Sequence, residues 1–312
     1  MGLTYDITQY ITSVKMSEKK RILVEGRDDR AHIKNLIFAK LGDTKIEVDT
    51  AENIRGKCEV TAKNNRAKIN QIHDICKLSK KHKNLYFFCD REYLKFSIGN
   101  KIEDLMNDHE NDGNLNWTIG HSLENYFIES DLIIDAFSYL SGSEFKASAL
   151  KLFKKVLPSA IKITTVIALS AKDIEHSSYP LGTIKWNDFY ICEKNLNLGL
   201  DIENWKLKNT NKLAENFIHC FSKYIPIIEH TDQLICSRIC RGHTAILILQ
   251  RIFSACLYFI GKDTDEPLSK KDAEKFAKIK ESFISNALCE SWIRMVKSEC
   301  AIYPSNLINS VA

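Results

Sequence analysis

The chain is organised by two short stretches, RILVEGRDD at residues 21–29 and LYFFCDRE at residues 85–92. In each of them a run of apolar residues leads directly into acidic ones. Short apolar runs bounded by polar residues predict strands of a sheet that is covered on both faces. A carboxylate just beyond the carboxyl end of such a strand lies at the edge where open α/β sheets bind ligands. We therefore expect two strands whose acidic ends meet.

If the two strands are neighbours, four carboxylates converge, those of Glu25, Asp29, Asp90 and Glu92. Such carboxylates repel one another, and a hard divalent cation with oxygen ligands, Mg²⁺ or Mn²⁺, would offset the repulsion. Asp29 follows Glu25 by four residues on the first turn of a predicted helix, where Asp28 competes for the same role and either could simply cap the helix. Asp90 and Glu92 are two apart, so in an extended segment they point to the same side and could bind one ion or two.

The two stretches resemble the motifs of the Toprim domain, which has Glu-Gly after its first strand and Asp-x-Asp after a later one. Toprim domains occur in topoisomerases, primases and nucleases of the overcoming-lysogenization-defect type. Glu92 departs from the usual second Asp. HSLENY at residues 121–126 resembles the HS-x-ENY signature of a Toprim-like family that is often partnered with an ABC-type ATPase in antiphage defence. RGHTAIL at residues 241–247 resembles the Gly-Lys-x-hydrophobic element of that family, with His in place of Lys.

The resemblance is greatest to the Toprim effectors of PARIS, the phage anti-restriction-induced system. It implies a metal-dependent nuclease that acts as a toxic effector, with Glu25 as general acid/base or metal ligand. It also implies an ABC-type ATPase that restrains the nuclease until a phage protein triggers its release. RNA is then favoured over DNA as the target, with transfer RNA as the candidate.

Further residues are candidates for catalysis or for binding the nucleic acid. Glu124 could complete the metal shell as a catalytic residue, and His121 could donate to phosphate. Arg91 is a weaker phosphate ligand, because it points away from Asp90 in an extended segment. Among the basic residues between positions 55 and 83, Lys63 and Arg66 could contact the backbone of a nucleic acid, although such a run is often only the solvated face of a helix. Arg241 and His243 could bind phosphate at the start of a helix near residue 244, or be a plain helix start.

The pattern of strands and helices predicts an α/β fold with a Toprim (Rossmann-like), mainly parallel sheet flanked by helices. A mainly helical C-terminal domain follows, and we place the two domains at residues 1–140 and 141–312. Strands are expected at 21–25, 45–49, 84–90 and 115–119, and a loop at 104–116. Helices are expected within 1–20 and at 28–41, 59–83, 132–140, 147–157, 211–224, 244–260 and 271–288, with a small strand near 190–192.

Bulk composition fits an ordinary globular protein, with 44% hydrophobic and 27% charged residues and a net charge of +4 over 312 residues. The ten cysteines are scattered singly and the N-terminus lacks the layout of a signal peptide, so we expect reduced thiols in a cytoplasm. The apolar window at 245–260 is too short and too interrupted for a membrane span, which predicts a core helix and no membrane partner. No Walker-type loop is present, so ATP hydrolysis would belong to a partner. A homodimer through the helical part is compatible with the sequence.

A second hypothesis belongs to another class. The Toprim-like fold could be a catalytically degenerate module that senses a ligand or docks the ATPase without cleaving anything. The departure at Glu92 favours this alternative.

Overall fold

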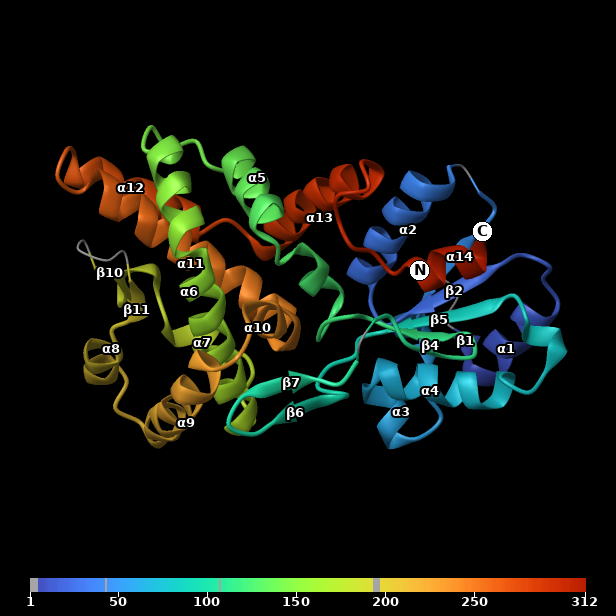
Figure 1. Ribbon diagram of the computed structural model, residues 1–312. Coiled ribbons are helices and arrows are strands. Elements are labelled where there is room, and N and C mark those ends of the chain that lie inside the picture. The colour runs from blue at the N-terminus through green and yellow to red at the C-terminus, as the bar shows by residue number, and fades with distance from the viewer. Residues whose placement is uncertain (1–4, 43, 107, 193–196) are drawn as a thin grey trace. The chain divides into compact units, whose positions relative to one another are not determined.

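The computed structural model describes residues 5–42, 44–106, 108–192 and 197–312 (Figure 1). The chain forms two compact units. Unit 1 comprises Met1–Glu92, Met106–Leu123 and Ile293–Ala312, and unit 2 comprises Tyr93–Leu105 and Glu124–Trp292. The sequence-based boundary between residues 140 and 141 therefore differs from this division, in which the chain enters unit 2 twice and returns to unit 1 at its end.

Unit 1 is built on a five-stranded sheet with the order β3-β2-β5-β9-β8. All neighbouring pairs are parallel except β8 and β9, which are antiparallel. The predicted loop at 104–116 is thus partly wrong, because it contains the edge strand β8. The four predicted strands are confirmed to within a few residues: β2 (Arg21–Val24), β3 (Glu47–Thr50), β5 (Leu85–Cys89) and β9 (Leu115–Trp117), with β8 at Asn111–Asp112.

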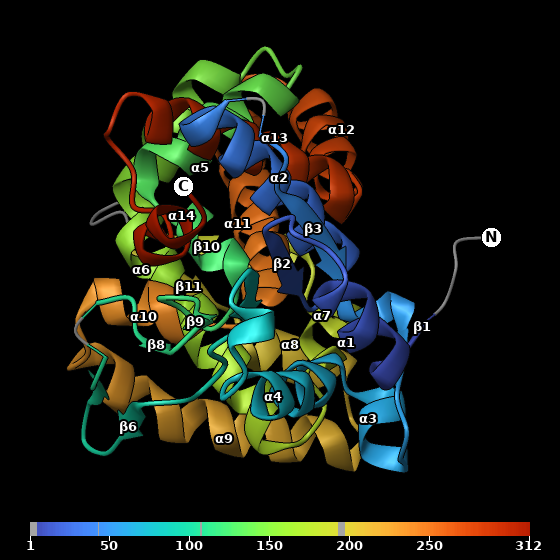
Figure 2. The same ribbon diagram turned by 90° about the vertical axis from the view of Figure 1, so that its right-hand side faces the viewer.

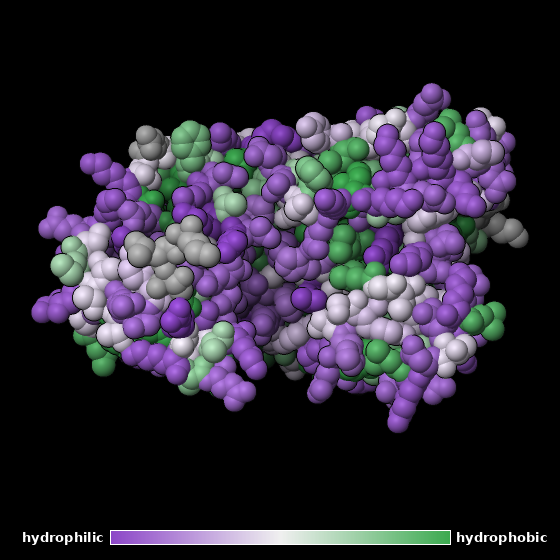
Figure 3. Space-filling view, turned by 180° about the vertical axis from the view of Figure 1, so that it is seen from behind, coloured by the Kyte–Doolittle hydropathy of each residue, from purple (hydrophilic) through white to green (hydrophobic). Residues whose placement is uncertain are grey.

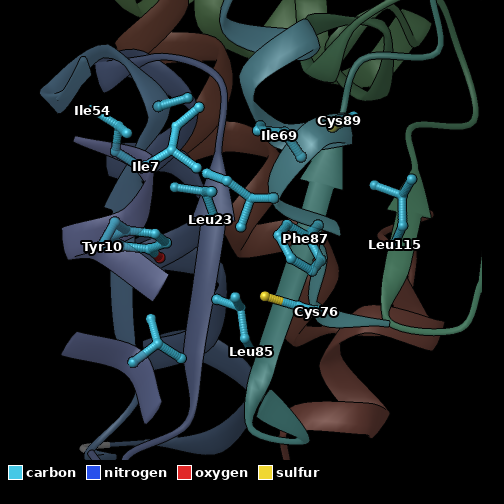
Figure 4. Packing of buried hydrophobic residues seen from close by; sticks show 13 residues of the cluster. Ile7, Tyr10, Leu23, Ile54, Ile69, Cys76, Leu85, Phe87, Cys89 and Leu115 are labelled. Atoms are coloured by element: carbon cyan, nitrogen blue, oxygen red, sulfur yellow. The ribbon is translucent and has the colours of Figure 1, made fainter. Parts of the chain in front are cut away.

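Helices cover both faces of this sheet, which explains why its strands read as continuous apolar runs. Figures 1 and 2 show α2 (Arg27–Leu41) and α14 (Ser305–Val311) on one face, and α1 (Ile7–Lys15), α3 (Glu59–Lys63) and α4 (Asn65–Cys76) on the other. In α14, Leu307, Ile308 and Val311 are buried, so the end of the chain belongs to unit 1 because it covers an apolar sheet face. On the other face the core includes Leu23 and Phe87 (Figure 4).

The prediction of a single helix at 59–83 is wrong, because the structure divides this helix and its second part ends at Cys76. Asn64 ends α3 and caps α4, since its side chain accepts a hydrogen bond from the backbone N–H of Ala67. Asn is a favoured N-cap residue, so this break could have been predicted from the sequence. Unit 1 also contains short elements: β1 (Tyr5–Asp6) paired in parallel with β4 (Ile54–Arg55), and the 3-10 turns η1 (Ala51–Asn53) and η2 (Lys80–His82).

Unit 2 is mainly helical, as predicted. The helix expected at 147–157 continues to Asp173 through Pro158, because much of its length is buried against neighbouring helices. The helix expected at 271–288 is two helices. The helices are α5 (Ser130–Leu140), α6 (Lys146–Asp173), α7 (Tyr179–Thr183), α8 (Ile202–Lys208), α9 (Lys212–Glu229), α10 (Gln233–Ile239), α11 (Gly242–Gly261), α12 (Glu266–Ala277) and α13 (Glu281–Lys297), the last of which ends in unit 1.

Short strands complete unit 2, and they include the small strand expected near residue 190. Two antiparallel hairpins are present: β6 (Phe96–Ile98) with β7 (Ile102–Asp104), and β10 (Phe189–Ile191) with β11 (Leu198–Leu200). The 3-10 turns are η3 (Leu123–Phe127), which begins at the last residue of unit 1, and η4 (Trp186–Asp188).

The core of unit 2 lies around α11. By length and composition α11 could cross a membrane, but 72% of its apolar window is buried inside the protein. A core helix passes the same test, and the burial of α11 confirms the core helix that the sequence predicts. The face in Figure 3 is mostly hydrophilic, and its hydrophobic residues form small separate patches.

Candidate active site

Glu25 and Asp90 come together at the carboxyl edge of the sheet in unit 1. Strands β2 and β5 are adjacent and parallel, with Val24 opposite Phe88, so both acids follow at the same edge. The backbone N–H of Asp90 donates to Oε1 of Glu25 at 3.1 Å. The chain passes from β2 to β3 on one side and then to β5 on the other, so the edge between β2 and β5 is the point where strand order reverses. Open α/β sheets bind ligands at this point.

Asp29, and not Asp28, is the acid of α2 that lies close to Glu25. The Asp29 Oδ2 atom accepts the N–H of Gly26 at 2.8 Å, which turns its carboxylate toward the end of β2. Its charge is one of the causes that raise the pKa of Glu25. Asp28 is exposed on the helix surface. Of the two acids that the sequence left open, Asp29 is therefore the one placed near Glu25, and its role as a metal ligand stays a prediction.

The carboxyl group of Glu25 has an unusual protonation equilibrium. Burial, above all, raises the pKa of Glu25 to about 7, while the N–H of Asp90 opposes the shift and Asp29 adds to it. The buried thiol of Cys89 lies near the same acids, and its pKa is raised well above its usual range by burial and then by Glu25 and Asp90. Near neutral pH, Glu25 can therefore both hold and release a proton.

The charge of Glu92 is one of the causes that raise the pKa of Glu25, so it acts on the same acidic edge. The prediction of an extended segment nevertheless fails at Glu92. Its φ angle is 51°, in the left-handed region, so the alternation of side chains is broken at this residue. Its N–H donates to the carbonyl of His121 at 2.7 Å, which fixes this turn. The Glu92 carboxylate is 54% exposed and pairs with Nη1 of Arg66 at 2.6 Å.

The sequence left open whether Arg66 contacts a nucleic acid or lies on the solvated face of a helix. In the structure its side chain packs against other side chains of unit 1. Its guanidinium lies over the ring of Trp117, 5.2 Å from the centroid, and binds Glu92. Its charge also lowers the pKa of Glu25, against the effect of burial. Arg66 is therefore the cation of this acidic edge. Lys63, by contrast, is a surface residue that faces Glu59 at 3.8 Å.

Two of the predicted substrate-binding residues are buried. Arg91 is fully buried, its N–H donates to Oγ1 of Thr118 at 2.8 Å, and its Nη1 donates to the carbonyl of Ile119 at 2.7 Å. The prediction that Arg91 contacts phosphate is wrong, because its guanidinium binds the strand-end backbone of its own unit. His121 is also buried, and its carbonyl oxygen accepts the Glu92 N–H.

Glu124 and His243 form a separate cluster in unit 2. One ring nitrogen of His243 lies 3.2 Å from Oε1 of Glu124, and the other contacts Glu281 at the start of α13. The hydrogen bond to Glu281, and then the charge of Glu124, raise the pKa of His243 to about 9. The imidazolium is held between two carboxylates that would repel a phosphate, so the predicted phosphate site at His243 is wrong. Arg241 is the N-cap residue of α11 and its side chain makes no capping hydrogen bond.

Two charged residues at the same edge of the sheet were missed by the sequence analysis. Glu52 follows β3 in η1, and its Oε2 lies 3.1 Å from Nε of Arg27. Applying the strand-end argument to β3 would have found it. The Nζ atom of buried Lys68 donates to the carbonyl of Ala51 at 3.0 Å, and burial lowers the pKa of Lys68. No sequence pattern marks Lys68 as different from the other lysines between residues 55 and 83.

The donor set suits a divalent cation in kind, because all of its groups are carboxylates and Glu25 lies where its negative charge is poorly compensated. The arrangement is incomplete, however. Among the described residues, no group of three or more His, Cys, Asp or Glu side chains is positioned to hold a metal ion. Glu92 is turned to Arg66, and Asp90 Oδ1 accepts the N–H of Leu123 at 3.2 Å. Before Glu92 or Asp90 Oδ1 could bind an ion, each would have to leave its present partner, Arg66 or the N–H of Leu123.

Comparison of the chain with models of protein families and with curated proteins finds no match.

Proposed function

We propose that the protein is a metal-dependent nuclease whose active site is the acidic edge of unit 1. The observation that carries this proposal is the hydrogen bond from the Asp90 N–H to Glu25 Oε1 at the reversal point of a parallel sheet. It joins two acids that are 65 residues apart in the chain. Nucleic acids are polyanions, and carboxylates attract them only through a cation. A carboxylate pair at a ligand edge therefore suits phosphodiester chemistry with Mg²⁺ or Mn²⁺.

The residues that would hold the cation are Glu25, Asp90 and Asp29, with Glu92 after its release from Arg66. A bound divalent ion would supply activation of water and stabilisation of the leaving oxygen. Without the ion, the pKa of Glu25 is about 7, and a bound ion would favour the ionised carboxylate, the form that can accept a proton. Arg66, once released from Glu92, can bind a phosphate oxygen through its guanidinium.

The wider role is proposed on the resemblance of the motifs alone. The nuclease would be the toxic effector of a prokaryotic antiphage system and would act in the cytoplasm. An ABC-type ATPase would restrain it until a phage protein triggers release. RNA would be the substrate, with transfer RNA as the candidate. The same resemblance would make Glu124 a further catalytic residue, and its carboxylate would first have to leave His243, with which it pairs.

The direct test compares wild type, Asp90→Asn and Asp112→Asn on labelled RNA and DNA, in Mg²⁺ and in EDTA. Asp112 is an exposed acid on β8, so it controls for the same change of charge. We expect cleavage by wild type and Asp112→Asn in Mg²⁺, and none in EDTA. Asp90→Asn should also bind Mn²⁺ at least about tenfold more weakly by calorimetry, which is the effect expected for loss of a metal ligand or its close support. Cleavage that persists in EDTA would contradict the proposal.

Arg66→Ala should tighten Mn²⁺ binding and lower turnover at the same time. Arg66 competes with the ion for Glu92, and an ion pair of this exposure is worth up to about 1 kcal/mol, so the gain is about fivefold. The titration is made near pH 8 and repeated at neighbouring pH values, because loss of Arg66 also removes a charge that lowers the pKa of Glu25. Lys77→Ala is the matched control, because Lys77 also pairs with an acid, Asp74 at 2.7 Å, in unit 1. Equal affinities for wild type and Arg66→Ala would show that Glu92 is not a ligand.

A second candidate function is a non-catalytic module that senses a ligand or docks the ATPase. The pairing of Glu92 with Arg66 favours it, because this contact closes the acidic edge with an internal cation. The same calorimetry separates the two functions. A protein that binds no Mn²⁺ at a site dependent on Asp90, yet still binds its ATPase, would belong to this class.

A further inference from the structure

Unit 2 contains two neighbouring pockets that share the residues Trp186 and Asn187. One pocket has a volume of about 550 Å³ and lies between η4 and helices α11 and α12. The other has a volume of about 260 Å³ and lies between η4, β10 and α11. Because both are lined by Trp186 and Asn187 of η4, they are two compartments that adjoin at this turn. We refer to them together as the η4 groove.

The larger compartment is basic. Its charged lining consists of four cations and one acid: Lys185, Arg251, Lys270, Lys278 and Glu274. Arg251 is held in place by donating to the carbonyls of Ile184 at 2.6 Å and Leu181 at 2.7 Å. Lys270 and Lys278 are exposed side chains along α12, and Lys278 reaches Glu274 only at 4.0 Å. An anion in this compartment would therefore meet a net positive charge.

The smaller compartment is aromatic. It is lined by Tyr190, Tyr258 and Phe259 together with Trp186, and the rings of Trp186 and Tyr258 are 5.3 Å apart. Tyr190 is 50% exposed and lies over Gly199 of β11, where an added Cβ would come within 2.4 Å of its hydroxyl oxygen. The hairpin thus needs glycine at position 199 so that the Tyr190 ring can lie against it. Aromatic side chains that are partly exposed beside a basic compartment are placed for stacking.

We propose that the η4 groove binds single-stranded nucleic acid, with an unstacked base against Trp186 or Tyr190 and backbone phosphates along Lys270 and Lys278. Aromatic platforms next to a positive track are the common chemistry of single-strand binding, because every base has a π face and every linkage a phosphate. A duplex does not offer free base faces to such a pocket. This adds a second binding surface to the nuclease proposed above, and it does not depend on cleavage at Glu25.

The test measures binding of labelled single-stranded RNA and DNA of roughly twelve nucleotides by fluorescence anisotropy in EDTA. Trp186→Ala should weaken binding by about 5- to 100-fold, and Trp186→Phe should restore most of the loss, since stacking of one base accounts for this range. Lys270→Ala/Lys278→Ala should weaken binding and reduce the slope of log affinity against log salt by about 1.4, the value for two phosphate contacts on a single strand.

The matched control is Lys151→Ala/Lys155→Ala, which removes the same charge from exposed positions of α6 in unit 2. If this control lowers the affinity and the salt slope as much as the α12 variant does, the binding is diffuse and the groove is not a site. Binding to anionic phosphatidylserine vesicles without binding to either oligonucleotide would also overturn the proposal. The groove is tested by oligonucleotide binding in EDTA and the nuclease by cleavage in Mg²⁺, so failure of the groove and failure of the nuclease can be told apart.

Discussion

Glu25→Gln should raise the free energy of unfolding by about 2 kcal/mol near pH 8 while it lowers nuclease activity by at least about a thousandfold. The gain in stability arises because the folded protein holds Glu25 in a buried, acidic environment that disfavours its charge. Gln keeps the oxygen that accepts the Asp90 N–H but cannot ionise. The loss of activity follows from the loss of the proposed metal ligand and proton acceptor.

The direction of this change in stability follows from the pH range in which Glu25 ionises. The ordinary pKa of the Glu25 carboxyl is 4.5, and burial raises the pKa of Glu25 to about 7 in the folded protein. Below 4.5 the group is neutral in both states, and wild type and Glu25→Gln should be equally stable. Between the two values only the unfolded chain ionises, so wild type loses stability as the pH rises, and above 7 the difference is constant. The measurement is urea unfolding of both proteins across this range.

The same prediction can be tested a second time by adding Mg²⁺ or Mn²⁺ to both proteins. A divalent ion favours ionised Glu25, so it should stabilise wild type and release protons near neutral pH, but leave Glu25→Gln unchanged. Asp112→Asn is again the control, and it should follow wild type in every condition. A Glu25→Gln protein that is less stable than wild type near pH 8 would show that Glu25 is ionised and stabilising, against the environment described here.

The meeting of Glu25 and Asp90 could be predicted from the sequence because it follows from strand geometry. Each acid directly follows a short apolar strand, and parallel neighbours bring their carboxyl ends to one edge. The orientation of Glu92 could not be predicted in this way, because it depends on one left-handed residue and on a pair with Arg66, 26 residues away. Contacts of this kind are set by packing between elements and leave no periodic signal in the chain.

The motifs that contain Glu124 and His243 show the same limit of sequence-based prediction in unit 2. The start of a helix near His243 could be predicted, and free N–H groups there suggest an anion site. The structure supplies the anions from the protein itself, Glu124 and Glu281, the latter 38 residues further along the chain. The return of α14 to unit 1 was missed for a similar reason, since its apolar face shows that it is buried but not where.

Phe253→Ala should lower the free energy of unfolding by about 3–5 kcal/mol, the range for removing a large buried aromatic side chain. Phe253 is fully buried in α11 and packs against the rings of Phe137, Phe153 and Phe276 at centroid distances of 5.3, 5.5 and 4.7 Å. These rings come from α5, α6 and α12, so one side chain joins four helices of unit 2. Phe253→Leu keeps most of the volume and should cost clearly less. Urea unfolding monitored by far-ultraviolet circular dichroism gives both values, and equal losses for the two variants would argue against a cavity as the cause.

Glu25→Gln and Phe253→Ala should change the free energy of unfolding in opposite directions. Effects on catalysis can therefore be separated from effects on folding. Phe253→Ala should retain its specific activity well below its midpoint of thermal unfolding, because the proposed catalytic acids lie in unit 1 and the folded population is intact. Glu25→Gln should be inactive under conditions in which it is more stable than wild type. If activity instead followed stability across both variants, the loss in Glu25→Gln could not be assigned to the carboxylate, and the acidic edge of unit 1 would not be the catalytic site.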